Sequence, residues 1–151
     1  MKRGRTLIAA IAGISLCAAA PTRSEAPEIA YRAHVDMKTF MEHVLTPAAT
    51  VIWRVNGSVL DASGEHDLAP KTDADWERVV TGAATLAEAT NALMIPARAR
   101  DREWSRYARK LGTAADQAYR AAEAHDLKAI SDVSDRLDGI CADCHRHYGL
   151  E

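Results

Sequence analysis

Aromatic residues are scarce in this sequence: phenylalanine, tryptophan and tyrosine together make up 5% of its 151 positions. The chain also lacks internal repeats, low-complexity runs and a nucleotide-binding glycine loop. It has no nucleophile elbow, no recognisable spaced pair of carboxylates and no metal motif beyond the one near its C-terminus. Nothing therefore indicates hydrolytic catalysis, and we expect a protein that is not an enzyme.

Hydrophobic residues make up 48% of the chain, and many of them are alanine. Alanine has the highest helix propensity, whereas sheets favour the β-branched and aromatic residues. The composition therefore predicts an all-α protein with closely packed helices. A chain of 151 residues is long enough for one domain with a substantial core, and we expect a single domain.

The N-terminus has the pattern of an export signal. A cationic start is followed by an apolar run from Leu7 to Ala20, and small residues come next. This run is shorter than the roughly 20 residues of a membrane-spanning helix, so an uncleaved anchor is the less favoured alternative. We expect a signal peptide at residues 1–19, cleaved near Ala19, and a periplasmic domain at residues 20–151 that is soluble after export.

Loss of the signal changes the charge and the cysteine content. Residues 1–19 contain Cys17 and three cations, Lys2, Arg3 and Arg5, so 16 cations and 21 acids remain, a net charge of −5. A mildly acidic protein is not expected to bind nucleic acid. Export also implies an oxidising compartment, in which the neighbouring thiols of Cys141 and Cys144 would be oxidised or occupied by a ligand.

Apolar spacing of three and four residues predicts four helices. They cover about residues 29–55, 72–94 and 101–124, and a fourth begins after Asp126 and includes the C-terminal cysteines. Short links favour antiparallel neighbours, so we predict an up-down-up-down four-helix bundle. In this bundle the start of the first helix and the end of the fourth lie at the same end of the molecule.

Local sequence signals predict where the helices are interrupted and where the second one begins. Thr46 followed by Pro47 suggests an N-cap, so the first helix should kink or restart there. Residues 56–71 are predicted to form a long loop with at most a local turn. Thr72 and Asp75 have the spacing of a capping box at the start of the second helix.

The motif near the C-terminus is Cys141-Ala142-Asp143-Cys144-His145, a C-x-x-C-H sequence. This pattern is typical of c-type haem attachment. Two thiols one helical turn apart can bond the two vinyl groups at one porphyrin edge, while the adjacent imidazole ligates the iron. The sequence therefore predicts one covalent haem c, held by Cys141 and Cys144, with His145 as proximal iron ligand.

Three other interpretations of the motif stay open. A thioredoxin-like dithiol would lie at the start of a helix after a strand, whereas this motif ends a helix. A zinc ion held by the two cysteines, His145 and His147 would make the chain a zinc-stabilised helical interaction module, although ligands so close in sequence are hard to arrange tetrahedrally. The third interpretation is a coincidental spacing.

The motif, Tyr148 in a C-x-x-C-H-x-x-Y pattern, the export signal and the four predicted helices together resemble the class II c-type cytochromes, the cytochrome c-prime family and its low-spin relatives. The resemblance is specific in sequence only near residues 137–148. Family members usually carry Arg or Lys after that tyrosine, where this chain has Gly149. The loop at residues 56–71 is also longer than is usual in the family.

By this resemblance, a residue of the first helix covers the distal face of the haem. Met41 is the preferred iron ligand, Met37 one turn earlier is the alternative, and His34 is a third candidate. The remaining choices are no sixth ligand and a packing role for both methionines. Trp53, Trp76 and Trp104 are expected core residues, any of which could contact the haem.

The sixth ligand decides the expected function. A methionine ligand closes the iron and suits one-electron transfer, which is the favoured interpretation. An open, apolar distal face would instead bind small gases such as NO or CO. The resemblance also implies redox partner proteins, and homodimers are common in the family.

Overall fold

The computed structural model describes residues 31–150 and is mostly helical. The predicted signal peptide at residues 1–19 lies outside the described residues. Three long helices dominate: α3 (Asp73–Leu93), α4 (Arg102–Glu123) and α5 (Leu127–Tyr148). The all-α prediction is confirmed, and the bounds of these helices lie close to the predicted ones.

The first helical segment is shorter than predicted. It comprises α1 (Met37–Phe40), the π-helical turn η1 (Met41–Leu45), α2 (Thr46–Trp53) and the 3-10 turn η2 (Arg54–Asn56). Residues 31–35 are not helical, so the predicted start at residue 29 is wrong for the part that the structure describes. The helix begins after Asp36 because its carboxylate accepts a hydrogen bond from the backbone N–H of Thr39 (2.8 Å), as an N-cap does.

Pro47 does not start a new helix. The backbone is helical on both sides of it, and Thr46 is itself helical rather than an N-cap, which corrects the predicted restart. The chain instead forms a π turn in which the N–H of Thr46 bonds the carbonyl of Met41, five residues back. A proline ring clashes with the carbonyl four residues earlier in a regular α-helix, and the wider π turn relieves that clash.

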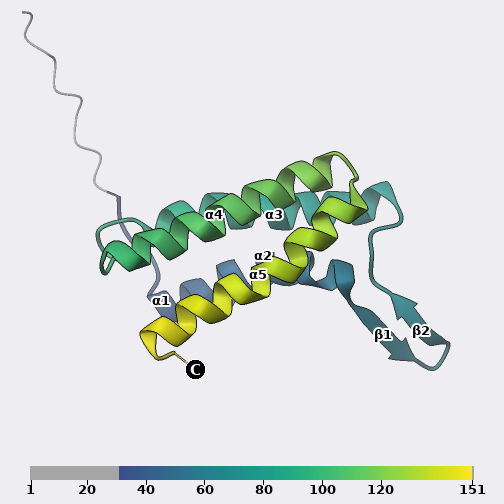
Figure 1. The fold of residues 1–151 in the computed structure, drawn as a ribbon, viewed down its shortest axis with the longest axis horizontal. Coiled ribbons are helices and arrows are strands. Elements are labelled where there is room, and N and C mark those ends of the chain that lie inside the picture. Colours follow the sequence, from purple (N-terminus) through teal and green to yellow (C-terminus); the bar gives the residue numbers. More distant parts are fainter. Residues whose placement is uncertain (1–30, 151) are drawn as a thin grey trace, which may run out of the picture.

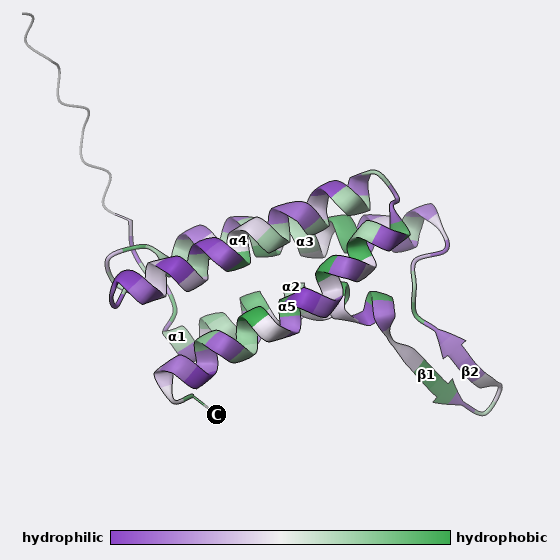
Figure 2. Cartoon of the chain, viewed as in Figure 1, coloured by the Kyte–Doolittle hydropathy of each residue, from purple (hydrophilic) through white to green (hydrophobic). Residues whose placement is uncertain are grey.

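Residues 56–71 contain a β-hairpin, which the sequence analysis predicted as a loop. Strand β1 (Ser58–Asp61) pairs antiparallel with β2 (Gly64–Asp67), and Val59 lies opposite His66. Gly64 at the turn has φ of +120°, a conformation open to glycine but strained for other residues. Figure 2 shows the hydrophobic part of the hairpin on β1, whereas β2 is mostly hydrophilic.

Side-chain caps begin the three long helices. The capping box predicted at Thr72 and Asp75 is present at the start of α3. Asp101 caps α4 and Asp126 caps α5, each accepting a backbone N–H three residues ahead. These local signals explain why the starts of the three helices were predicted closely.

Small side chains let the helices approach closely. α3 packs along α4, and α5 contacts both α4 and α2. A Cβ atom on Gly112 would lie 2.8 Å from the Thr90 hydroxyl, and one on Gly82 would lie 2.9 Å from Cβ of Val51. Six alanines of α4 are buried in the core: Ala108, Ala114, Ala115, Ala118, Ala121 and Ala122.

The two ends of the molecule differ (Figure 1). α1 and the C-terminal end of α5 lie at one end, and the hairpin projects at the other. Asn56 anchors the base of the hairpin because its amide donates hydrogen bonds to the Ser131 carbonyl (3.1 Å) and to Asp135 Oδ1 (2.7 Å) of α5. Among residues 31–150, no helix combines the length and the hydrophobicity needed to cross a membrane.

Candidate functional site

A mainly apolar cavity lies between the first helical segment, α3, α4 and the end of α5. Its volume is about 90 Å³. Small-molecule and cofactor sites typically have apolar walls with a few polar groups, as this cavity does, but they measure about 300–1,000 Å³, so the walls of this cavity would have to separate to hold a large cofactor. Its lining residues are Met41, Leu45, Thr46, Ala49, Trp53, Leu86, Leu93, Trp104, Tyr107, Ala108, Leu111, Ile140, Cys141, Cys144 and His145.

One wall of the cavity is the C-x-x-C-H motif. Cys141, Cys144 and His145 lie in the last two turns of α5 and line the cavity together. Both thiols are partly buried and form no disulfide. The helical spacing of three and four residues brings all three groups to the same side of α5.

Burial raises the pKa of the Cys141 thiol to about 11, and the nearby Asp138 carboxylate adds to the effect. Burial also raises the pKa of Cys144, although the positive charge of Arg100 acts in the opposite direction. A dithiol of the thioredoxin kind needs a lowered pKa, which the start of a helix favours. These protonated thiols at the end of a helix do not support the redox-dithiol interpretation.

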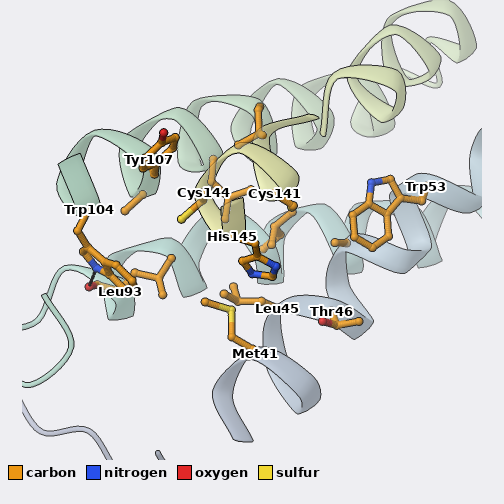
Figure 3. Close-up of a pocket in the computed structure, with 15 residues that line it drawn as sticks. Met41, Leu45, Thr46, Trp53, Leu93, Trp104, Tyr107, Cys141, Cys144 and His145 are labelled. Carbon is orange, nitrogen blue, oxygen red and sulfur yellow. Dashed lines mark hydrogen bonds between the residues drawn. The ribbon is translucent and has the colours of Figure 1, made fainter. Parts of the chain in front are cut away.

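Met41 lines the facing wall. Figure 3 shows its side chain pointing from the first helical segment toward His145 of α5. Met41 is the first residue of the π turn, so the turn at Pro47 helps to set the direction of this side chain. π turns often occur at functional sites.

The two alternative ligand candidates lie elsewhere. Met37 packs against the core but does not line this cavity. His34 is exposed and precedes the first helical residue, so it does not share the helical stripe on which the sequence analysis placed it. Of the three candidates, the structure brings only Met41 to the cavity.

Two of the three tryptophans contribute to the cavity wall. Trp104 is buried, and its indole N–H donates a 2.7 Å hydrogen bond to the carbonyl of Leu93. Trp53 Nε1 is buried without a hydrogen-bond partner in the described part of the chain. Trp76 does not line the cavity and stacks on His125, with ring centroids 4.9 Å apart.

Several lining residues were predicted to face the core but were not predicted to belong to the site. Helical periodicity places Leu45 on the stripe of Met41 and points Tyr107 and Leu111 inward, and Ala49 follows Leu45 by four residues. Periodicity does not show which inward residues meet around one cavity, because only the packing of the helices brings them together.

The residues that follow the motif fix the end of α5. The Tyr148 hydroxyl donates a hydrogen bond to Asp101. Gly149 has φ of +64° and ends the helix in the left-handed conformation, which explains a glycine at the position where the resemblance predicts a cation. His147 is exposed and lies beside Tyr107, with ring centroids 5.6 Å apart.

No group of three or more His, Cys, Asp or Glu side chains within residues 31–150 is arranged to hold a metal ion. The zinc interpretation therefore has no preformed ligand cluster in that range to support it. In comparisons with known proteins, no protein family, curated protein or solved structure matches the chain.

Proposed function

We propose that this chain is a periplasmic class II c-type cytochrome that carries single electrons. The observation that supports the proposal is the cavity into which α5 presents Cys141, Cys144 and His145, with Met41 on the facing wall. Two thiols and an imidazole on one side and a thioether on the other are the donor set of a methionine-ligated haem c. The chemistry of these donors therefore fits this group, and the cavity of about 90 Å³ would have to widen to hold it.

Each residue has a defined role in this proposal. Cys141 and Cys144 would hold the haem by two thioether links, and His145 and Met41 would supply its two iron ligands. When bound, haem c supplies a one-electron redox centre. A methionine ligand favours the reduced iron more than a second histidine would, and unchanged ligation on redox keeps the reorganisation small.

The cavity walls would control the surroundings of the iron. Apolar side chains such as Leu45, Leu86 and Leu111 exclude water, and a drier site shifts the reduction potential. Trp53 has an unpartnered indole N–H, which an acceptor group of the cofactor could satisfy.

The proposal extends to the helix arrangement and the localisation. We propose that the first helical segment, α3, α4 and α5 form an up-down-up-down bundle. The short links between α3 and α4 and between α4 and α5, and the contacts of α2 and α4 with α5, support this topology. Covalent haem attachment to C-x-x-C-H takes place after export, in agreement with the predicted signal peptide.

The experiment that tests the proposal is an optical spectrum of the protein produced with haem-maturation machinery. We expect a Soret band that stays with the protein after acid-acetone extraction, and a low-spin reduced spectrum that CO does not change. A high-spin reduced spectrum that shifts with CO would instead support a gas-binding cytochrome. Absence of a Soret band would contradict both.

A further inference from the structure

The positive charge of the chain is concentrated in one short segment. Residues 98–110 contain six cations, five arginines and Lys110, against two acids, Asp101 and Glu103, which is a net charge of +4. The whole chain has 19 cations and 21 acids, so the remaining residues carry 13 and 19, a net charge of −6. The segment is thus strongly basic in an otherwise acidic protein.

Most of these cations are exposed on one region of the surface. Arg100, Arg102, Arg106, Arg109 and Lys110 are exposed, and we call them the basic surface. Arg102, Arg106 and Arg109 follow one another at steps of four and three, so they form one stripe along α4. Arg98 is buried and serves the fold, donating hydrogen bonds to the carbonyls of Val35 (3.0 Å) and Ala92 (3.3 Å).

The basic surface borders the motif side of the cavity. The Arg100 guanidinium lies 5.2 Å from the ring centroid of Trp104, which lines the cavity, and 5.1 Å from that of Tyr148. Lys110 reaches Asp143 within the motif, with Nζ 3.6 Å from Oδ2. Arg100 and Lys110, at one edge of the basic surface, therefore lie beside the site at which the haem would be attached. Arg102 and Arg109 precede the cavity-lining Trp104 and Leu111 by two residues and extend the surface onto the opposite face of α4.

Aromatic rings lie between the cations. Arg106 lies over Tyr107, 4.5 Å from the ring centroid, and Tyr107 lines the cavity. Next to it are His147 and Tyr148, whose ring centroids are 4.8 Å apart. Arginine and aromatic residues are enriched in protein interfaces, whereas lysine is depleted. Four of the five cations of the basic surface are arginine, so its composition favours a protein partner over general solubilisation.

Local acids neutralise only part of this charge. Glu103 accepts a hydrogen bond from Arg106, and Asp143 pairs with both Lys110 and Arg146. Within residues 31–150, Arg100, Arg102 and Arg109 form no salt bridge. These three cations are therefore available to a negatively charged surface.

We propose that the basic surface docks a redox partner protein with an acidic face. The inference rests on the proposed function, because it assigns the surface to the partner that exchanges electrons with the haem. Complementary charge around the cofactor would speed association and orient the partner over the Cys144 side of the cavity. The net negative charge of the rest of the chain would repel an acidic partner from other faces.

The test uses the haem-loaded protein and poly-L-glutamate as an acidic polypeptide. Binding is followed by calorimetry and by amide NMR shifts. The test variant is Arg100→Glu with Lys110→Glu, and the matched control is Arg54→Glu with Lys128→Glu. Both change the charge equally, but the control residues are exposed on other helical segments. We expect shifts at residues 98–110, and binding about tenfold weaker in the test variant only.

Electron transfer to small oxidants gives a second readout. The test variant should be oxidised more slowly than wild type by anionic ferricyanide and faster by cationic tris(1,10-phenanthroline)cobalt(III), while the control should change much less. Opposite effects on the two oxidants identify local charge and exclude a general loss of activity. Low ionic strength should enlarge both effects, since salt screens exposed charges.

Several outcomes would overturn the inference. Equal binding by the test and control variants would contradict the docking surface while leaving a spectroscopically normal cytochrome, so the proposed function would stand. Tighter binding to phosphatidylglycerol vesicles than to poly-L-glutamate would assign the surface to a membrane. If the protein carried no covalent haem, that result would contradict both the proposed function and the redox role of the partner.

Discussion

The hydroxyl of Tyr148, at the end of α5, donates a 2.7 Å hydrogen bond to Oδ1 of Asp101, the N-cap of α4. The same carboxylate oxygen accepts the backbone N–H of Trp104 at 2.8 Å. One side chain thus both caps α4 and fixes the last turn of α5, three residues after His145. The contact holds two walls of the cavity in register.

Replacing Tyr148 with Phe tests this link. The variant should lose about 1 kcal/mol of unfolding free energy, because a hydrogen bond to a carboxylate is lost while the ring is kept. Urea denaturation of the haem-loaded protein measures the change. Tyr31→Phe is the control, since Tyr31 is 69% exposed. Equal stability of the two variants would show that the hydrogen bond contributes nothing.

The two methionines should behave differently. Met41→Ala should convert the low-spin reduced spectrum to a high-spin one that responds to CO, because it removes the proposed distal ligand from the cavity wall. Met37→Ala should keep the low-spin spectrum, since Met37 packs against the core away from the cavity. A low-spin, CO-insensitive Met41→Ala protein would exclude Met41 as the ligand.

Two glycine-to-alanine changes should have opposite effects on stability. At Gly82 a new Cβ would lie 2.9 Å from Val51 Cβ and 3.1 Å from the Ala48 carbonyl oxygen, so α2 and α3 must separate, at a cost of about 1–3 kcal/mol. At Gly139 in α5 nothing lies within 4 Å, and alanine should stabilise the helix by up to about 1 kcal/mol. Thermal unfolding of both variants measures the difference, and a destabilised Gly139→Ala protein would be evidence against the described packing of α5.

The capping box of α3 should make stability depend on acid. The Asp75 carboxylate accepts the backbone N–H groups of Lys71 (3.0 Å) and Thr72 (2.9 Å), which lower its pKa to about 2 from the ordinary 3.8. A pKa lowered by folding stabilises the protein fully above about pH 4, and the contribution is lost as the pH falls toward 2.

Comparison of wild type with Asp75→Asn checks this dependence. The difference in melting temperature should be largest at pH 5 and should shrink toward pH 2, where the wild-type carboxylate also becomes neutral. Asp73→Asn removes the same charge from the first turn of α3 and serves as the control. A difference that is constant with pH would show that the charge of Asp75 contributes nothing to the cap.

The sequence predicted the long helices well because their signals are local. Thr72, Asp101 and Asp126 cap their helices through contacts three residues away, and the apolar period continues through each helix. The C-x-x-C-H motif is equally local, since three side chains one turn apart on α5 suffice to define it.

The features that were missed depend on weaker or more distant contacts. The hairpin has few hydrophobic residues and exposed strands, with Leu60 79% exposed, so no alternation of buried and exposed residues marks it. The first helix begins later than predicted because Asp36 caps it. The apolar spacing continues before Asp36, and the prediction followed that spacing instead of the cap. The cavity was not predicted because it forms only when helices that are far apart in sequence pack together.

The π turn at Met41–Leu45 would let a one-residue deletion change which side chain of the first helical segment faces the cavity. A π turn contains one more residue than an α turn, and one residue rotates a helix by about 100°. Deleting a single residue there would therefore turn the N-terminal part of the segment and present a neighbour of Met41 to the cavity. The side chain that faces the cavity at this position could in this way be exchanged by a rotation of the helix, with no substitution of Met41, the proposed distal ligand.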